Sequence, residues 1–216
     1  MLKYKLSELR EKVIYESSLV EKMLKLAVEG LLELDSIKLE QAFDYESQIN
    51  SLELEIEEMC ISLIALYQPE AKDLRTIVMI LKMNSDLERM GDMGVNIIGS
   101  AQYLIERPQL KQLISLPNMA KETINMMNDA MKSFVTDDVD LAKKVCVFDD
   151  VIDAYNEQIA RELLTYMLAD AKNIERSMHL MRISQNLERI ADLCTNIAEE
   201  TVFIKEGRVI KHHQNK

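Results

Sequence analysis

The chain contains nearly the same charged phrase twice, and this repeat limits the folds that it can adopt. The stretch LERMGDMGVNI at 87–97 returns as LERIADLCTNI at 187–197. Earlier in each half, ESQINSLELEI at 46–56 overlays DDVIDAYNEQI at 149–159, at an offset of 103 residues. Core packing alone does not require Glu, Arg, Asp and Asn at matching places. The chain therefore consists of two copies of one structural unit.

Each copy is expected to be helical. Only five Gly and three Pro interrupt 216 residues rich in Leu, Met, Glu and Lys, which favour helices. Apolar residues recur at spacings of three and four, and turn-forming residues separate the periodic segments. We expect six helices, at about 5–34, 38–67, 69–106, 117–135, 138–168 and 172–206.

Three helices followed by three helices predict an all-α fold of two tandem three-helix bundles. Helices of about 30 residues span roughly 45 Å, so elongated bundles are their natural packing. We place the first repeat at 1–107 and the second at 108–216. A coiled-coil spacer is the alternative, but the interrupted segments and the internal repeat count against it.

Charge and composition exclude several classes of protein. The net charge of −11 argues against a nucleic-acid partner. The start, MLKYKLSELREKV, is too charged for a secretory signal, and no run of about 18 apolar residues could span a bilayer. The three cysteines form no Cys-x-x-Cys pair, which favours a reducing compartment. We expect a soluble cytoplasmic protein that does not insert into a membrane.

Oxygen-bearing side chains recur every four residues on four of the expected helices, so that each set shares one helix face. These sets are Glu46 and Asn50, with Glu53 and Glu57 following; Asn84, Glu88, Asp92 and Asn96; Asp149, Asp153 and Glu157; and Ser184, Glu188, Asp192, Asn196 and Glu200. Like charges at this spacing repel, and a bound cation would reverse the sign. Such hard oxygen ligands suit magnesium, calcium, manganese or iron.

Other interpretations of these residues compete with a metal site. A single stripe is typical of a solvated surface, although matching stripes in two repeats favour binding. Arg89 and Arg189 are interpreted as clamps on neighbouring carboxylates, with a salt bridge from Arg89 to Asp92. A metal-dependent enzyme would need a positioned acid or base, and no histidine lies near either motif. The glycines of the third helix are interpreted as close-packing sites, at Gly91, Gly94 and Gly99.

The motifs YQPEAKDLR, LERMGD and LERIADLCTNI, in this order and at repeat spacing, resemble the PhoU family of bacterial phosphate-signalling regulators. The resemblance covers nearly the whole chain. It implies two three-helix bundles that bind metal ions or multinuclear clusters through Glu/Asp-x-x-x-Asp motifs, with magnesium, manganese, iron and zinc all compatible. Carried over by position, the implied ligands are Glu46, Asn50, Glu88 and Asp92 in one half and Asp149, Asp153, Glu188 and Asp192 in the other.

Two departures qualify this resemblance. Ala191 stands where the second motif usually has glycine, a change that affects packing only. Asn50 stands where the second repeat has Asp153, and an amide oxygen adds no charge. We therefore expect the first site to bind cations less tightly than the second.

The resemblance also implies a function. It indicates a negative regulator of phosphate uptake and phosphate-starvation signalling, not an enzyme. Such a protein would couple the ATPase of a phosphate ABC transporter to its sensor histidine kinase at the inner face of the membrane. Separately, long bundles with exposed apolar positions favour a homodimer. The alternative is a metal store or helical scaffold without a role in phosphate signalling.

Overall fold

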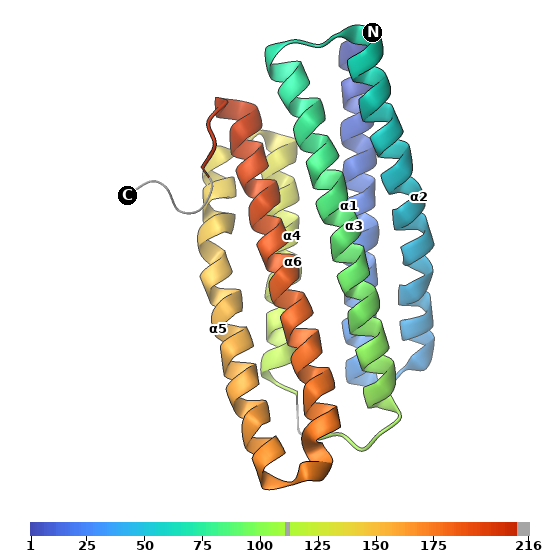
Figure 1. Ribbon diagram of the computed structural model, residues 1–216, viewed down its shortest axis with the longest axis vertical. Coiled ribbons are helices and arrows are strands. Elements are labelled where there is room, and N and C mark those ends of the chain that lie inside the picture. The colour runs from blue at the N-terminus through green and yellow to red at the C-terminus, as the bar shows by residue number, and fades with distance from the viewer. Residues whose placement is uncertain (111–112, 211–216) are drawn as a thin grey trace.

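The described part of the chain forms six long helices (Figure 1). The computed structural model describes residues 1–110 and 113–210, and these residues contain no strand. The helices are α1 (Leu2–Glu33), α2 (Ser36–Tyr67), α3 (Ala71–Ile105), α4 (Ser115–Thr136), α5 (Val139–Ala169) and α6 (Ile174–Glu206), and one 3₁₀ turn, η1 (Ala171–Asn173), precedes α6. The expected all-α class and the six helices are confirmed. Among the described residues, no helix is both long and apolar enough to cross a membrane.

The two repeats make their first turn in the same way. Leu34 and Asp137 adopt the left-handed backbone conformation directly after α1 and α4, with φ of 57° and 52°. The next residue, Asp35 or Asp138, then accepts two backbone N–H groups of the following helix with its side chain. These caps satisfy donors that a helix start leaves free. The two turns correspond at an offset of 103 residues, so α1 is equivalent to α4 and α2 to α5.

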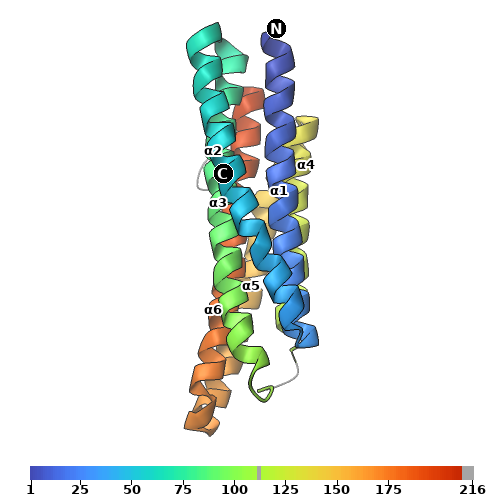
Figure 2. The same cartoon turned by 90° about the vertical axis from the view of Figure 1, so that its right-hand side faces the viewer.

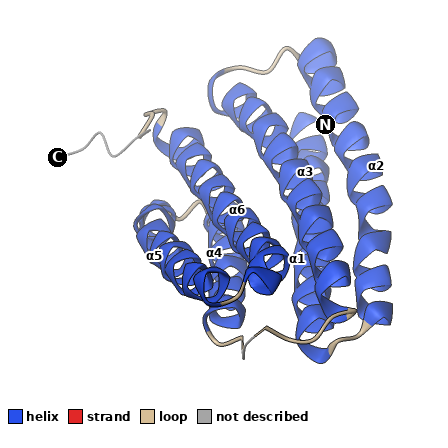
Figure 3. Ribbon diagram, turned by 60° about the horizontal axis from the view of Figure 1, so that its bottom comes forward, coloured by secondary structure: helices blue, strands red, loops and turns tan. Residues whose placement is uncertain are grey.

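Two three-helix bundles lie side by side, α1–α3 in one and α4–α6 in the other (Figure 3). Their main contact runs between α3 and α6, and the turned view shows α1 beside α4 (Figure 2). The helices α3 and α6 are antiparallel, since Arg75 near the start of α3 lies beside Gly207 after α6. At the opposite ends, the hydroxyl of Tyr103 donates a hydrogen bond to Glu175, 2.6 Å away. The tandem-bundle prediction is confirmed, whereas the boundary between residues 107 and 108 stays a prediction.

Small residues let the helices of the first bundle approach closely. A methyl group on Gly94 would lie 2.8 Å from the Met23 sulfur, and one on Gly91 would lie 3.3 Å from Ile49 Cγ2. Both positions are therefore close-packing sites, as predicted. A methyl group on Gly99 would meet nothing within 4 Å. The prediction for Gly99 is wrong, because this position faces open space.

Candidate functional site

The helices α5 and α6 bring together the four carboxylates predicted for the second repeat. Asp149 is half-buried, and its enclosed Oδ1 atom has no hydrogen-bond partner among the described residues. Burial and then the charges of Asp192, Asp153 and Glu188 raise the pKa of Asp149 to about 7. The charges of one residue on α5 and two on α6 therefore act together on the Asp149 carboxyl group. We call these four residues the second acidic cluster.

The α6 members of the second acidic cluster are perturbed in the same direction. Burial and then the charges of Asp192 and Asp153 raise the pKa of Glu188. Burial and then Asp153 raise the pKa of Asp192. The positive charge of Arg189 opposes both shifts, and its role as a clamp stays a prediction. Repulsion among these carboxylates disfavours their ionised form, and a bound cation would offset that repulsion.

The first bundle gathers a different set of carboxylates. Burial, then Asp92 and then Glu53 raise the pKa of Glu88. Glu53 lies on α2 two helical turns beyond Glu46, the residue that the motif comparison selected. Asn50 is exposed and Glu46 is half-buried. The charge from α2 that acts on Glu88 is therefore that of Glu53.

One member of the first set escaped the sequence analysis. Glu16 on α1 is fully buried, and burial and then the charges of Glu53 and Glu88 raise its pKa to about 9. The sequence does contain an indication that Glu16 faces the core. Glu16 follows Val13 by three residues and precedes Val20 by four, so it occupies a place on the apolar face of its helix. We call Glu16, Glu53, Glu88 and Asp92 the first acidic cluster.

Polar links hold the helix pairs together beside both clusters. The Asn84 amide donates a hydrogen bond to the backbone carbonyl oxygen of Glu53, 3.0 Å away. In the second bundle, Ser184 donates a hydrogen bond to the Asn156 amide oxygen. These links occupy equivalent places in the two repeats. Asn84 thus links α3 to α2, and Ser184 links α6 to α5.

Some other stripe residues make contacts outside the clusters. Glu157 pairs with Arg161 at 3.0 Å on an exposed surface. Arg89 pairs with Asp86 at 3.4 Å, so the predicted salt bridge to Asp92 is wrong. The reason is that Asp86 is buried at the contact of α3 with α6, where the guanidinium offsets part of its desolvation.

The donor chemistry of both clusters fits a hard cation. Each offers several carboxylates, and the second contains an enclosed oxygen without a partner in the described structure. As the side chains stand, no group of three or more His, Cys, Asp or Glu residues in 1–110 and 113–210 could hold a metal ion. The clusters therefore supply ligands of the right type, and binding an ion would require their side chains to converge.

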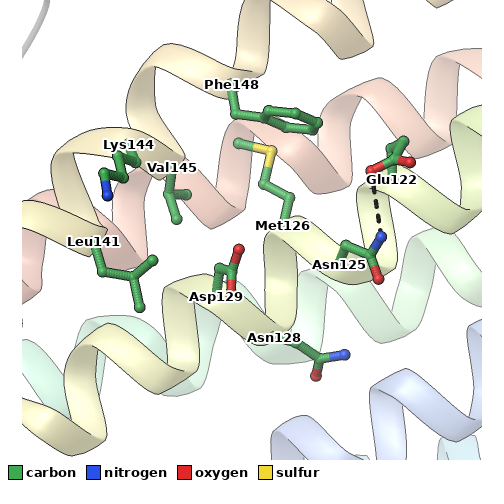
Figure 4. A pocket seen from close by; sticks show the side chains of 9 residues that line it. All are labelled: Glu122, Asn125, Met126, Asn128, Asp129, Leu141, Lys144, Val145 and Phe148. Atoms are coloured by element: carbon green, nitrogen blue, oxygen red, sulfur yellow. Dashed lines mark hydrogen bonds between the residues drawn. The ribbon is translucent and has the colours of Figure 1, made fainter.

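A separate cleft lies between α4 and α5 (Figure 4). Its volume is about 380 Å³. Met126, Val145 and Phe148 form apolar parts of its wall. Glu122 accepts a hydrogen bond from Asn125 there, at 3.3 Å. The residues that line this cleft include none of the eight predicted ligands, so the cleft is distinct from the acidic clusters.

Sequence comparisons agree with this two-bundle arrangement. The model of the PhoU domain matches the chain twice, at residues 16–101 and 116–201. This chain belongs to the PhoU family. The resemblance seen in the motifs is confirmed, and each match falls on one of the two bundles.

Known PhoU proteins resemble the chain over nearly its whole length. The "Phosphate-specific transport system accessory protein PhoU homolog" of Aquifex aeolicus is 42% identical, over 98% of this chain and 96% of the homologue. The PhoU protein of Escherichia coli is 30% identical, over 96% of this chain and 86% of its own. The crystal structure of PhoU from Pseudomonas aeruginosa has a TM-score of 0.93 and 32% identity, covering 96% of this chain and 100% of that one.

Proposed function

We propose that this chain is a non-enzymatic negative regulator of phosphate uptake and phosphate-starvation signalling. The observation that carries the proposal is the near full-length similarity to proteins named as accessory proteins of the phosphate-specific transport system. A similar structure from Streptococcus pneumoniae is named as a regulatory protein of phosphate transport, with a TM-score of 0.89 and 26% identity. Regulation of that system is the role that this similarity supports.

The proposed mechanism is that of an adaptor. The chain would contact the ATPase of a phosphate ABC transporter and a phosphate-sensing histidine kinase, and so act in the cytoplasm at the inner face of the membrane. Two related bundles in one chain provide two similar but unequal surfaces, which suits a protein that joins two partners. Formation of a homodimer stays a prediction.

Metal binding by the two acidic clusters is part of the proposal. The proposed ions are divalent or iron-type, held by carboxylates that burial and like charges destabilise in their ionised form. The eight residues of the motif comparison are the starting ligand set, with Asp149, Asp153, Glu188 and Asp192 best placed. A bound cation would stabilise the folded chain by mass action.

An affinity experiment tests the adaptor role. The tagged chain is incubated with detergent-solubilised membranes that contain the phosphate transporter and the kinase, with and without manganese and phosphate. We expect the transporter ATPase and the kinase to be retained. If neither partner were retained under any condition, the adaptor proposal would be contradicted. The alternative function, a metal store or helical scaffold, would then remain. A store should take up many ions per chain, whereas fixed sites saturate at a few.

A further inference from the structure

A stack of three side chains joins the two bundles where α3 ends and α6 begins, at the lower end of the view in Figure 1. The rings of Tyr103 on α3 and His179 on α6 lie 3.8 Å apart, with an angle of 11° between their planes. The guanidinium carbon of Arg107 lies 3.5 Å from the centre of the same tyrosine ring. Two groups this close to one ring centre must lie on its opposite faces, because they would otherwise overlap. Tyr103 is therefore held between a permanent cation and an imidazole.

Hydrogen bonds beside the stack tie α3 and the segment that follows it to α6. The Tyr103 hydroxyl donates to Glu175, 2.6 Å away. Arg107 donates to the backbone oxygen of Tyr103, one helical turn earlier, at 2.7 Å. From α6, Arg176 donates to the backbone oxygen of Pro108 at 2.9 Å. The stack thus lies at the point where the chain leaves the first bundle for the second.

The surroundings of His179 suit a neutral imidazole. Its Nδ1 atom is enclosed and has no hydrogen-bond partner among the described residues. A neutral imidazole leaves one nitrogen without a proton, so an enclosed Nδ1 is compatible with that form. A charged imidazole carries a proton on both nitrogens, and the proton on Nδ1 would then have no acceptor in this arrangement. The closed stack therefore accommodates neutral His179 and disfavours its cation.

The charged groups around His179 also favour the neutral form on balance. They come from both helices of the contact, with Arg182 and Glu175 on α6 and Arg107 directly after α3. Burial and then the two arginines lower the pKa of His179, and Glu175 opposes them in part. Protonation of His179 would also place a second cation against the tyrosine ring that Arg107 already covers.

The internal repeat shows that packing of α3 against α6 does not require these side chains. At the offset of 100 residues that relates α3 to α6, Tyr103 corresponds to Phe203 and His179 to Met79. Met79 is buried, and Phe203 packs half-buried against the core. Neither of these two residues can gain a proton. One end of the α3–α6 contact therefore carries a titratable group at a place where the other end is apolar.

We propose that the Tyr103–His179 stack is a pH-sensitive clasp between the two bundles, closed while His179 is neutral and opened when His179 gains a proton. Opening separates the two rings and releases the segment 106–110 from α6. Because the pKa of His179 is lower in the folded chain than in the unfolded chain, the sign of the effect is fixed. The stabilisation by the clasp is complete above the unfolded value of about 6.5 and is lost as the pH falls through the folded pKa.

Nuclear magnetic resonance of the full chain tests the clasp, with the ring protons of His179 as the probe. Replacing the other two histidines, by His212→Gln and His213→Gln, leaves a single histidine signal. A stacked imidazole lies in the ring current of Tyr103, so its protons should resonate upfield at about pH 8, where histidine is neutral. This upfield shift should disappear in step with the titration of His179. An upfield shift that persists in the fully protonated imidazole would overturn the proposal.

Hydrogen exchange measures the same opening in the backbone. After correction for the intrinsic effect of pH, exchange at 103–110 and 174–180 should accelerate at least about fivefold between about pH 8 and about pH 5. Exchange at 74–82 and 200–206, the opposite end of the α3–α6 contact, should not accelerate. His179→Met copies the other repeat and should remove the acceleration. Equal acceleration in the wild type and in His179→Met would overturn the role of His179, and the resonance test does not depend on the folding of this variant.

Discussion

Lys72 Nζ lies 3.0 Å from Asp137 Oδ2, and this ion pair joins the start of α3 to the turn between α4 and α5. Arg10 of α1 and Lys205 of α6 also reach the Asp137 carboxylate, at 3.5 Å and 3.7 Å. Burial opposes ionisation of Asp137, but the hydrogen bond from Lys72 and the charges of Arg10, Lys72 and Lys205 outweigh it and lower its pKa. This carboxylate thus connects the two bundles through Arg10 and Lys72, whereas Lys205 belongs to its own bundle.

Asp137→Asn should therefore destabilise the chain by about 1 kcal/mol at pH 7, the scale of a partly exposed ion-pair network. Asn tolerates the left-handed backbone at this position, so the loss of stability would come from removing the negative charge. The pKa of Asp137 is lower in the folded chain than in the unfolded chain. Its contribution to the free energy of unfolding is therefore fully present above the unfolded pKa, and it is lost as the pH falls through the folded pKa. Urea unfolding at pH 7 and at about pH 3 checks this. Asp44→Asn, at an exposed site on α2, is the control and should change little at either pH.

Asp149 predicts the opposite pH dependence. Its folded pKa of about 7 lies above the unfolded value, so the folded chain loses stability as the pH rises from about 4 to about 7. Asp149→Asn should stabilise the metal-free chain by about 1–2 kcal/mol at pH 8, a figure discounted because the carboxyl is only half-buried. At pH 4 the gain should vanish. Thermal unfolding in chelator at both pH values measures it, with the exposed neighbour Asp150→Asn as the control. A gain of equal size at pH 4 would rule out the charge as its cause.

The turns and the second cluster were predictable from sequence because their causes are local or repeated. Asp is a strong helix cap, and Asp35 and Asp138 each cap the helix that follows them. The pairing of Asp149 and Asp153 with Glu188 and Asp192 needs only the spacing of four and a shared register between repeats. Each step depends on neighbours in the sequence or on the copy one repeat away.

The first cluster was not predictable in the same way. The repeat alignment transfers backbone positions, but side-chain identity differs at Glu53 and Asn156, so the charge on α2 moves two turns along the helix. By periodicity alone, Glu16 is a polar residue on the apolar face of its helix. The burial of Glu16 depends on how α1 packs against α2 and α3, which begin 20 or more residues later in the sequence. Periodicity marks the face, but it does not show that the acid on this face stays buried.

The glycines of α3 give a test of packing. Gly99→Ala should stabilise the chain by up to about 1 kcal/mol, because alanine favours a helix and the added methyl group meets nothing within 4 Å. Gly94→Ala should gain less or lose stability, because its methyl group would lie 2.8 Å from the Met23 sulfur. Urea unfolding of both variants measures the difference. Equal stabilisation of the two would show that Met23 moves aside at no cost.

The second acidic cluster makes the most direct prediction about metal. Replacing Glu188 and Asp192 together with alanine removes two of four crowded carboxylates, and alanine maintains the helix. In chelator the double variant should unfold at a higher temperature than the wild type, because repulsion within α6 and across to α5 is relieved. With manganese or iron, the wild type should gain stability by mass action and the variant should gain much less.

The matched control for this variant is Glu40→Ala with Glu58→Ala, which removes the same formal charge from exposed parts of α2. It should respond to metal as the wild type does. A solvated acidic face predicts a different pattern, in which both double variants behave alike in chelator and in metal. Thermal unfolding of the three proteins distinguishes these cases. If the wild type and the α6 variant showed the same metal-induced shift, the second acidic cluster would not be the site of binding.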